Sequence, residues 1–391
     1  MNYLKNKKIL ILSLVTVVVL MFLYWFFSGT VNPAKQSQTT TSTGITGKVG
    51  SLSSEQLSGQ SNSILNSQEI IPEEYKDKLT QITNFSVVSA SLNKTRDKIL
   101  YHKKDGGDLY SSDLNGQNQE KLSRITVVNM TEVIWSPARD RTAVFYLDGE
   151  TLKGFIQVGT SSVTVLPQNI KSFSWSPDGN SLAYLLQNEN KLDLTIANST
   201  GKNQRVVYST PMLDVQITWS SVDKILLKTA PSGFSENYVF VYSINSQALT
   251  KLIGPYFGMM INTGFGAGDI IFSRTNANGA APRIYLGNIS SGFDFRVNRN
   301  TISAKCVWAS ADKVYCATPS IYNPDVVWPD DYLMGIYNSG DFIESFDVKN
   351  NETSNILKGN FDVSNLIVMP DESYLFFINR IDGTLWSFKL K

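Results

Sequence analysis

The sequence predicts an all-β fold made of repeated four-stranded sheets, and three observations lead to this prediction. The 391-residue chain is rich in strand-forming and turn-forming residues, with 20 Phe, 17 Tyr, 26 Gly and 13 Pro. A motif in which an apolar strand ends in Trp and a tight turn leads into a second strand recurs along the chain. The length exceeds that of one ordinary core and suits several domains or one repeat fold.

Composition and charge exclude several classes of function. The net charge is +1, and the part of the chain after residue 35 holds 31 basic and 34 acidic residues, so no basic surface is left to bind nucleic acid. One histidine and two cysteines exclude most metal sites and every histidine-based triad except one that uses His102. We therefore expect no metal and no cofactor.

The amino-terminal segment predicts a membrane anchor. Residues 1–8 carry three lysines and no acid, and Ile9–Phe27 is an apolar run that ends in Tyr-Trp-Phe-Phe. As a helix this run spans roughly 28 Å, close to the thickness of the hydrocarbon core of a bilayer. The lysines place residues 1–8 in the cytoplasm, so 9–27 is predicted as a single-pass signal anchor at the cell membrane with the rest of the chain outside.

Two other interpretations of the apolar run are a cleaved signal peptide and a buried core helix. The run is longer than a usual signal-peptide core, and it ends in bulky aromatic residues instead of a small-x-small cleavage pattern. Residues 28–68 are rich in Ser, Thr, Gly and Gln and predict a disordered linker, with a reach of about 35 Å.

The clearest repeats are Val133–Tyr146, Phe173–Leu185 and Ile217–Lys228. Ser176-Pro177-Asp178-Gly179 has the chemistry of the tight turn, because Pro presets φ, Asp bonds the local backbone and Gly accepts positive φ. With the weaker copies, the motif is centred near positions 90, 135, 175, 219, 265, 308 and 368. A third and a fourth strand follow in each interval.

Four antiparallel strands about every 43 residues are the unit of a propeller blade, so residues 69–391 predict a seven-bladed β-propeller. The last repeat stops at its third strand, and Lys78–Ile82 matches Lys121–Ile125, a predicted fourth strand. The segment near 77–83 is therefore expected to close the ring. The alternative is a row of independent β domains, but units of this size without disulfides bury too little surface.

The Trp175–Gly179 turn and the strand pattern of Leu109–Leu122 resemble the TolB-type, WD40-like propeller repeat of bacterial envelope proteins. The resemblance covers about residues 69–391 and implies a propeller fold in the cell envelope. TolB proper has an α/β domain ahead of its propeller, and here the apolar run and the linker take that place. Similar blades precede the hydrolase domain of prolyl-oligopeptidase-type peptidases, and this sequence contains no such domain.

No catalytic motif stands out in the sequence. His102 lies in a predicted strand, where it is either a lone general base or a strand residue that faces outward or is hydrogen-bonded; no nucleophile pattern accompanies it, which favours the second interpretation. Asp105, Asp108, Asp113 and Asn115 form an acidic group at the two ends of a predicted strand. They are therefore interpreted as turn residues and not as a calcium loop.

Cys306 and Cys316 are equidistant from Ala311 at a predicted hairpin turn. Residues symmetric about such a turn face each other, with Cβ atoms about 4.5–5.5 Å apart. The pair is therefore a disulfide candidate in an extracytoplasmic domain. Two buried free thiols are the alternative.

The long segment Ser320–Gly340 joins the second and third strands of its repeat, so it is expected on the ring face opposite the Ser-Pro-Asp-Gly turns. Its aromatic and acidic residues suit recognition of a protein or glycan; they are Tyr322, Asp325, Trp328, Asp330, Asp331 and Tyr332. The alternative is a loop folded over the channel mouth with Trp328 as its plug. Tyr256 and Phe257 are expected on the same face and complete the candidate site.

Three functions remain from the sequence. The first is a non-enzymatic, membrane-anchored propeller that binds a protein partner of the cell envelope. The second is a propeller that binds peptidoglycan or another surface glycan. The third is an enzyme that uses carboxylates such as Asp330 or Asp331, against which the scarcity of histidine argues.

Overall fold

The computed structural model describes residues 73–123, 126–160, 162–264, 266 and 268–391. They belong to one structural unit, Glu69–Lys391. The predicted cytoplasmic tail, apolar run and linker lie outside the described residues. Within the described ranges, no helix is long and apolar enough to cross a membrane.

The strands of the described residues form six antiparallel sheets. The first contains β2 (Val87–Leu92), β3 (Lys98–Lys103), β4 (Leu109–Asp113) and β5 (Glu120–Lys121). The second contains β6 (Met130–Trp135), β7 (Arg141–Asp148), β8 (Thr151–Val158) and β9 (Ser162–Val165). The third contains β10 (Ile170–Trp175), β11 (Ser181–Asn188), β12 (Lys191–Asn198) and β13 (Arg205–Thr210).

The fourth sheet has seven strands: β14 (Val215–Ser221), β15 (Lys224–Thr229), β16 (Glu236–Ser243), β17 (Leu249–Thr263), β18 (Asp269–Thr275), β19 (Arg283–Asn288) and β20 (Gly292–Val297). The fifth contains β21 (Cys306–Ser310), β22 (Lys313–Pro319), β23 (Asp341–Asp347) and β24 (Glu352–Phe361). The sixth contains β25 (Val363–Val368), β26 (Tyr374–Asn379), β27 (Leu385–Lys389) and β1 (Leu79–Gln81). Short helical turns lie at Glu73–Tyr75, at Ser303–Lys305 and at α2 (Asp330–Leu333).

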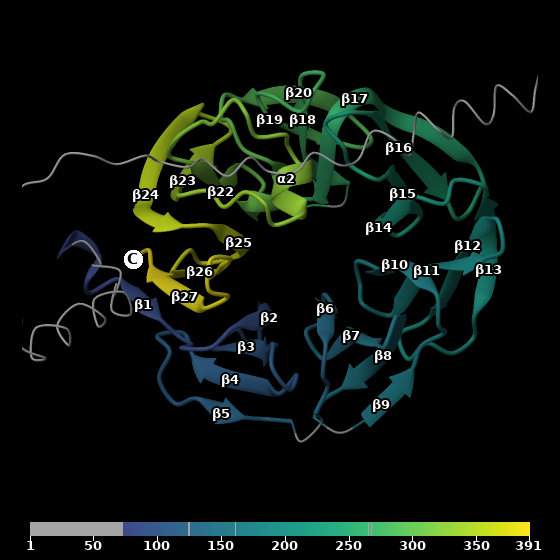
Figure 1. Cartoon of the computed structure of the whole chain (residues 1–391), viewed down its shortest axis with the longest axis horizontal. Coiled ribbons are helices and arrows are strands. Elements are labelled where there is room, and N and C mark those ends of the chain that lie inside the picture. The colour runs from purple at the N-terminus through teal and green to yellow at the C-terminus, as the bar shows by residue number, and fades with distance from the viewer. Residues whose placement is uncertain (1–72, 124–125, 161, 265, 267) are drawn as a thin grey trace, which may run out of the picture. The chain divides into compact units, whose positions relative to one another are not determined.

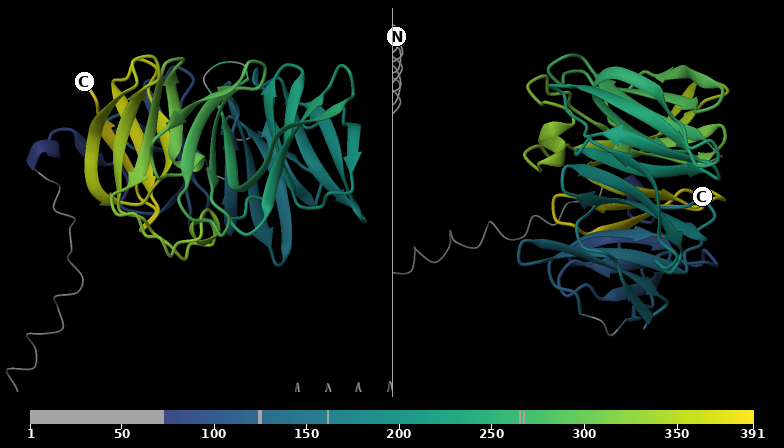
Figure 2. Two further views of the ribbon diagram at one scale, coloured as in Figure 1. Left: turned by 90° about the horizontal axis from the view of Figure 1, so that it is seen from above. Right: turned by 90° about the vertical axis from the view of Figure 1, so that its right-hand side faces the viewer.

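The sheets are arranged side by side in a ring, as Figure 1 shows face-on and Figure 2 from two further sides. The chain is therefore an all-β propeller. Its apolar clusters mostly lie between neighbouring sheets, such as the one that joins Phe145 and Ile156 of the second sheet to Phe173 and Leu182 of the third. The sheets are thus stabilised mainly by burial against their neighbours. The seven-stranded fourth sheet also has an apolar cluster of its own, formed by residues of β15 to β18.

The predicted number of seven blades is wrong. Counted by continuous hydrogen-bonded sheets, the described residues form six blades, because the repeats anchored near 219 and 265 belong to one sheet. Strand β17 pairs with β16 over its first part and with β18 over its second. Phe257 is the residue where the strand changes partner, since it lies opposite both Glu236 and Thr275.

The repeated turn has the local bonding that its sequence suggests. In the third sheet, the Ser176 hydroxyl donates to Asp178 at 2.5 Å and accepts from the Ser181 backbone N–H at 2.9 Å. The strand-ending tryptophans reach the preceding sheet: Trp175 donates to the Ile134 carbonyl at 3.0 Å and Trp135 to the Ser89 hydroxyl at 3.1 Å. The turn residues therefore fix this hairpin, while Trp135 and Trp175 tie neighbouring sheets together.

The two ends of the described chain meet in the sixth sheet. Strand β1, within the segment expected to close the ring, pairs antiparallel with β27, so that Leu79 lies opposite Phe388 and Gln81 opposite Trp386. Leu79 is buried in the same cluster as Trp386 and Phe388. The pairing covers an edge of the last sheet that would otherwise be open.

We expect Leu79→Ala to weaken this closure. Removing the buried side chain should lower the free energy of unfolding of the full-length chain by about 2–5 kcal/mol, measured by urea denaturation. Thr80→Ala is the matched control, because Thr80 is exposed on the same strand and its loss should cost less than about 0.5 kcal/mol. Equal stability of the two variants would contradict the role of β1.

Candidate functional site

The long segment between β22 and β23 contains α2, which lies inside the circle of sheets in the face-on view of Figure 1. Trp328 is 2% exposed and Tyr332 6% exposed. Both belong to an apolar cluster with Ile302 and Val326, and the Trp328 ring packs edge-on against Tyr337 at 5.4 Å. Trp328 and Tyr332, two of the aromatic residues predicted to bind a partner, therefore pack the loop against the protein interior and do not present free ring faces.

The acidic residues of the loop divide into two groups. Both carboxylate oxygens of Asp330 accept hydrogen bonds, from the Ser232 hydroxyl at 3.0 Å and the Gly233 backbone N–H at 2.6 Å. Asp331 accepts from the Val327 N–H at 2.8 Å. Asp325, in contrast, is exposed. The structure thus gives Asp330 and Asp331 roles in fastening the loop.

Tyr322 links the loop to a neighbouring segment. Its hydroxyl accepts a hydrogen bond from the Ala281 N–H at 2.9 Å, and its side chain is 38% exposed. The backbone N–H of Trp328 donates to the Gly279 carbonyl at 2.9 Å. The loop is therefore tied to the β15–β16 connection through Asp330 and to the β18–β19 connection through these two bonds.

Close backbone contact beneath Trp328 requires glycine at two positions. A Cβ atom at Gly233 would lie 2.7 Å from the Trp328 carbonyl oxygen, and one at Gly258 would lie 2.8 Å from the same atom. Gly258 also has a φ of +59°, which side-chain-bearing residues rarely adopt. These glycines let two other segments of the ring approach the loop backbone directly.

A buried ionic cluster lies next to Tyr332. The Lys305 ammonium, which is fully buried, donates to Asp341 at 2.6 Å, to Asp362 at 2.7 Å and to the Ser339 hydroxyl at 2.7 Å. Burial alone lowers the pKa of Lys305, but Asp341, Tyr332 and Asp362 together outweigh it and raise the pKa above its usual value. Lys305 therefore stays charged at neutral pH.

Arg380 connects this cluster to the loop. Its guanidinium donates to Asp362 at 3.0 Å and to the Tyr332 carbonyl at 2.8 Å. It also stacks on the Tyr332 ring, with the guanidinium carbon 3.8 Å from the ring centroid. Tyr332 is thus held by a cation on its face and by apolar packing against Trp328.

Large apolar side chains around this anchored loop point to solvent. We define the apolar rim as Leu333, Met334 and Ile336 of the loop together with Phe234, whose exposed fractions are 52%, 65%, 70% and 68%. Phe234 directly follows the Ser232–Gly233 pair that binds Asp330. Several exposed apolar residues beside one rigid element are typical of an interaction surface.

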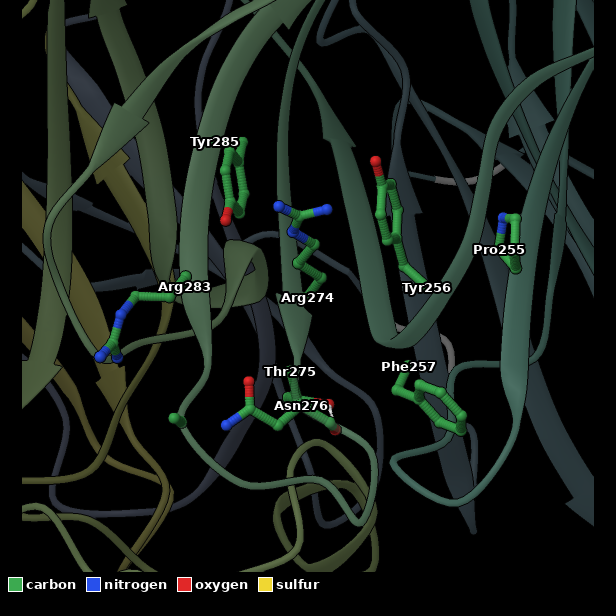
Figure 3. Close-up of a pocket in the computed structure, with 9 residues that line it drawn as sticks. Pro255, Tyr256, Phe257, Arg274, Thr275, Asn276, Arg283 and Tyr285 are labelled. Carbon is green, nitrogen blue, oxygen red and sulfur yellow. Dashed lines mark hydrogen bonds between the residues drawn. The ribbon is translucent and has the colours of Figure 1, made fainter.

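Tyr256 and Phe257 line a separate cavity of about 380 Å³, shown in Figure 3. The Arg274 guanidinium lies between two tyrosine rings, 4.2 Å from the Tyr256 centroid and 4.5 Å from the Tyr285 centroid. Ala281, which bonds to Tyr322, also lines this cavity. The structure therefore links the cavity to the long loop.

Sequence reasoning missed Arg274, Tyr285 and Lys305. Arg274 and Tyr285 come from different strands, β18 and β19, and only the register of the sheet brings them to Tyr256. Lys305 meets its aspartates from 36 and 57 residues away. No local pattern signals either group, because both depend on contacts between distant segments.

Cys306 and Cys316 lie directly opposite each other on β21 and β22, and the structure joins their sulfur atoms in a disulfide. His102 is buried, with Nδ1 3.1 Å from the Gly107 carbonyl oxygen, and burial lowers its pKa. Among the described residues, no group of three or more His, Cys, Asp or Glu side chains is placed to hold a metal ion.

Charged groups also line the middle of the ring. A cavity of about 610 Å³ is bounded by residues of the innermost strands β2, β6 and β25, including Glu132 and Asn365. Burial raises the pKa of Glu132, and Lys228 partly opposes this. Burial lowers the pKa of Lys228 to about 8, although Glu132 acts in the opposite direction. Partial loss of hydration disfavours the charged form of each group, which gives both shifts their direction.

No protein-family model and no curated protein matches the sequence. Among solved structures, the chain is similar to oligogalacturonate lyase from Vibrio parahaemolyticus, with 11% identity and a TM-score of 0.57 over 80% of this chain and 93% of that one. It is also similar to the β-propeller domain of the Trilobed protease from Pyrococcus furiosus, with 13% identity and a TM-score of 0.55 over 78% and 95%.

A putative TolB from Agrobacterium tumefaciens matches with 13% identity and a TM-score of 0.43 over 59% of this chain and 92% of that one. At such identities the likeness to lyase and protease domain shows the propeller fold alone, and the weaker likeness to TolB carries no further argument. The protease propeller is described as having an open velcro topology. In contrast, strands β1 and β27 close the ring here.

We expect Lys305→Met to destabilise the chain strongly, because it leaves Asp341 and Asp362 buried without their ammonium partner. The free energy of unfolding should fall by about 3–5 kcal/mol in urea denaturation. Lys251→Met, at an exposed position, should leave it unchanged. Limited proteolysis should also cut within 320–340 faster in Lys305→Met, and an unchanged rate would contradict the link between cluster and loop.

The lowered pKa of Lys228 predicts a pH effect on stability. Between about 8, its folded pKa, and its ordinary value of 10.5, the unfolded chain binds more protons at this site than the folded chain. The free energy of unfolding of the wild type should therefore rise over this range relative to that of Lys228→Met. The check is urea denaturation at several pH values, with Lys251→Met expected to follow the wild type. Parallel curves for wild type and Lys228→Met would refute the shift.

Proposed function

We propose that this chain is a non-enzymatic binding propeller of the bacterial cell envelope that docks a protein partner on its apolar rim. The observation that carries the proposal is the contrast within one loop. Trp328 and Tyr332 are buried, whereas Leu333, Met334 and Ile336 are exposed. Because the loop is bonded in place before any partner arrives, binding costs little ordering of its backbone.

The charge around the rim indicates the chemistry of the partner. The segment 320–340 contains three aspartates and no lysine or arginine. Asp330 and Asp331 are hydrogen-bonded only to neutral donors among the described residues. The expected partner segment therefore combines large apolar side chains with flanking basic residues, which would complement both features.

The proposed location follows from the sequence. The apolar run Ile9–Phe27 would hold the chain at the cell membrane, with the propeller outside the cytoplasm. A disulfide between Cys306 and Cys316 would suit that compartment. The enzyme hypothesis draws no support from Asp330 and Asp331, because their carboxylates fasten the loop.

The experiment is a crosslinked pull-down of the full-length chain from intact membranes. The double variant Leu333→Ser/Ile336→Ser should recover the partner about tenfold less than the wild type, since loss of two interface anchors costs at least about 1–2 kcal/mol. The same chain with Trp328→Ala is unsuitable, because Trp328 is part of the buried cluster under the loop.

The matched control is Val165→Ser/Val222→Ser, which removes two exposed apolar side chains away from the loop, 79% and 89% exposed. Its recovery of the partner should equal that of the wild type, and all three proteins should have the same melting temperature. Equal recovery by the rim variant would refute the docking site. If no protein is recovered at all, the proposal of a protein partner is refuted, and surface glycans become the candidate ligands.

A further inference from the structure

The cavity around Arg274 differs in chemical character from the apolar rim. Two arginines, Arg274 of β18 and Arg283 of β19, line it together with Asn276 and Thr275. Its volume of about 380 Å³ lies at the lower end of the range typical of ligand pockets.

The local sequence builds a rigid support for Arg274. Alternation along β18 places Phe272 and Arg274 on the same side of the strand. Phe272 is buried, lies opposite Tyr285 in the sheet, and stacks on its ring with a centroid distance of 4.9 Å. It also stacks on Tyr256 at 6.5 Å. The two tyrosines that enclose the guanidinium therefore rest on one buried aromatic side chain.

The positive charge of this cavity has no acidic partner in the described part of the chain. No ion pair there involves Arg274 or Arg283, and the bond that Arg283 makes goes to the Pro282 carbonyl at 3.1 Å. Figure 3 shows the Arg274 guanidinium between the two rings and Arg283 turned to one side. Rings cover both faces of the Arg274 guanidinium, so only its in-plane N–H groups can donate, and no hydrogen bond from them to another described residue is found. These groups match the two oxygens of a carboxylate.

We propose that this cavity binds the carboxylate of a peptide, either an acidic side chain or a carboxy terminus, with Arg274 as its bidentate partner. Pro255, Phe257 and Ala281 provide apolar walls for the side chain that carries or adjoins the carboxylate. A peptide suits the cavity better than an acidic sugar, because the guanidinium already covers the tyrosine faces on which a sugar ring would stack.

The test is saturation-transfer NMR on the full-length chain with five probes. Four are observed directly: N-acetylphenylalanine, its amide, N-acetylglutamate with its α-carboxyl amidated, and trigalacturonate. The fifth, inorganic phosphate, has no proton signal of its own and is tested as a competitor of the bound amino acid probe. We expect binding of at least one of the two carboxylate-bearing amino acid probes and none of the amide; which of the two binds distinguishes a carboxy terminus from an acidic side chain. Arg274→Gln should weaken that binding about tenfold or more, as expected for loss of a charge-assisted hydrogen-bonded pair.

Arg274→Lys serves as a second variant, since it keeps the charge but loses the fork and should also bind more weakly. Arg205→Gln, at an exposed position on β13, is the matched control and should bind like the wild type. Equal binding by Arg274→Gln, equal binding of the amide, or binding of trigalacturonate without the amino acid probes would each overturn the proposal. So would displacement of the bound amino acid probe by an equal concentration of phosphate, or no binding of any probe. Because no probe reports on the rim, the pull-down and this test fail independently.

Discussion

The pairing of β1 with β27 is the constraint on which the rest of the ring depends. Each sheet of the propeller buries apolar surface against its two neighbours, so a sheet with one neighbour missing would expose that surface. The closing contacts join residues about 300 positions apart, including the Leu385 N–H that donates to the Thr83 hydroxyl at 3.0 Å. A few hydrogen bonds between the two ends of the described chain therefore maintain the ring, and the ring in turn keeps the apolar surface between all the sheets buried.

Ring closure also brings together the ionic cluster against which the long loop packs. Lys305 directly precedes β21 of the fifth sheet, whereas Asp362 and Arg380 flank β25 and β26 of the sixth. The ionic cluster thus forms only where the fifth and the closing sheets meet. Since Arg380 also binds Tyr332, the position of the loop depends on the seam between these sheets and not on the loop sequence alone.

Local sequence patterns predicted the propeller class well and its sheet count badly. The hairpin turns and the strand-ending tryptophans act over a few residues, and their period is visible in the sequence. The continuity of β17 is not, because Gly254 and Pro255 in its middle suggest a break, and only pairing with β16 and β18 reveals one strand. The candidate site was likewise predictable only in part. The long loop is evident in the sequence from its length, but the burial of Trp328 and the contacts of Arg274 arise from long-range contacts that the sequence does not show.

The two binding surfaces that we propose have opposite electrostatic requirements. The loop that carries the rim is acidic, whereas the cavity at Arg274 and Arg283 is basic, and the bond between Tyr322 and Ala281 connects them. A ligand with the wrong charge at either surface would face protein groups of the same charge. This repulsion lowers the binding affinity more than a neutral group at the same place would. Fixed charges at preorganised sites therefore select ligands by repelling the wrong charge as well as by attracting the right one. Ring closure makes the propeller rigid, and this rigidity keeps the distance and orientation between the two surfaces constant.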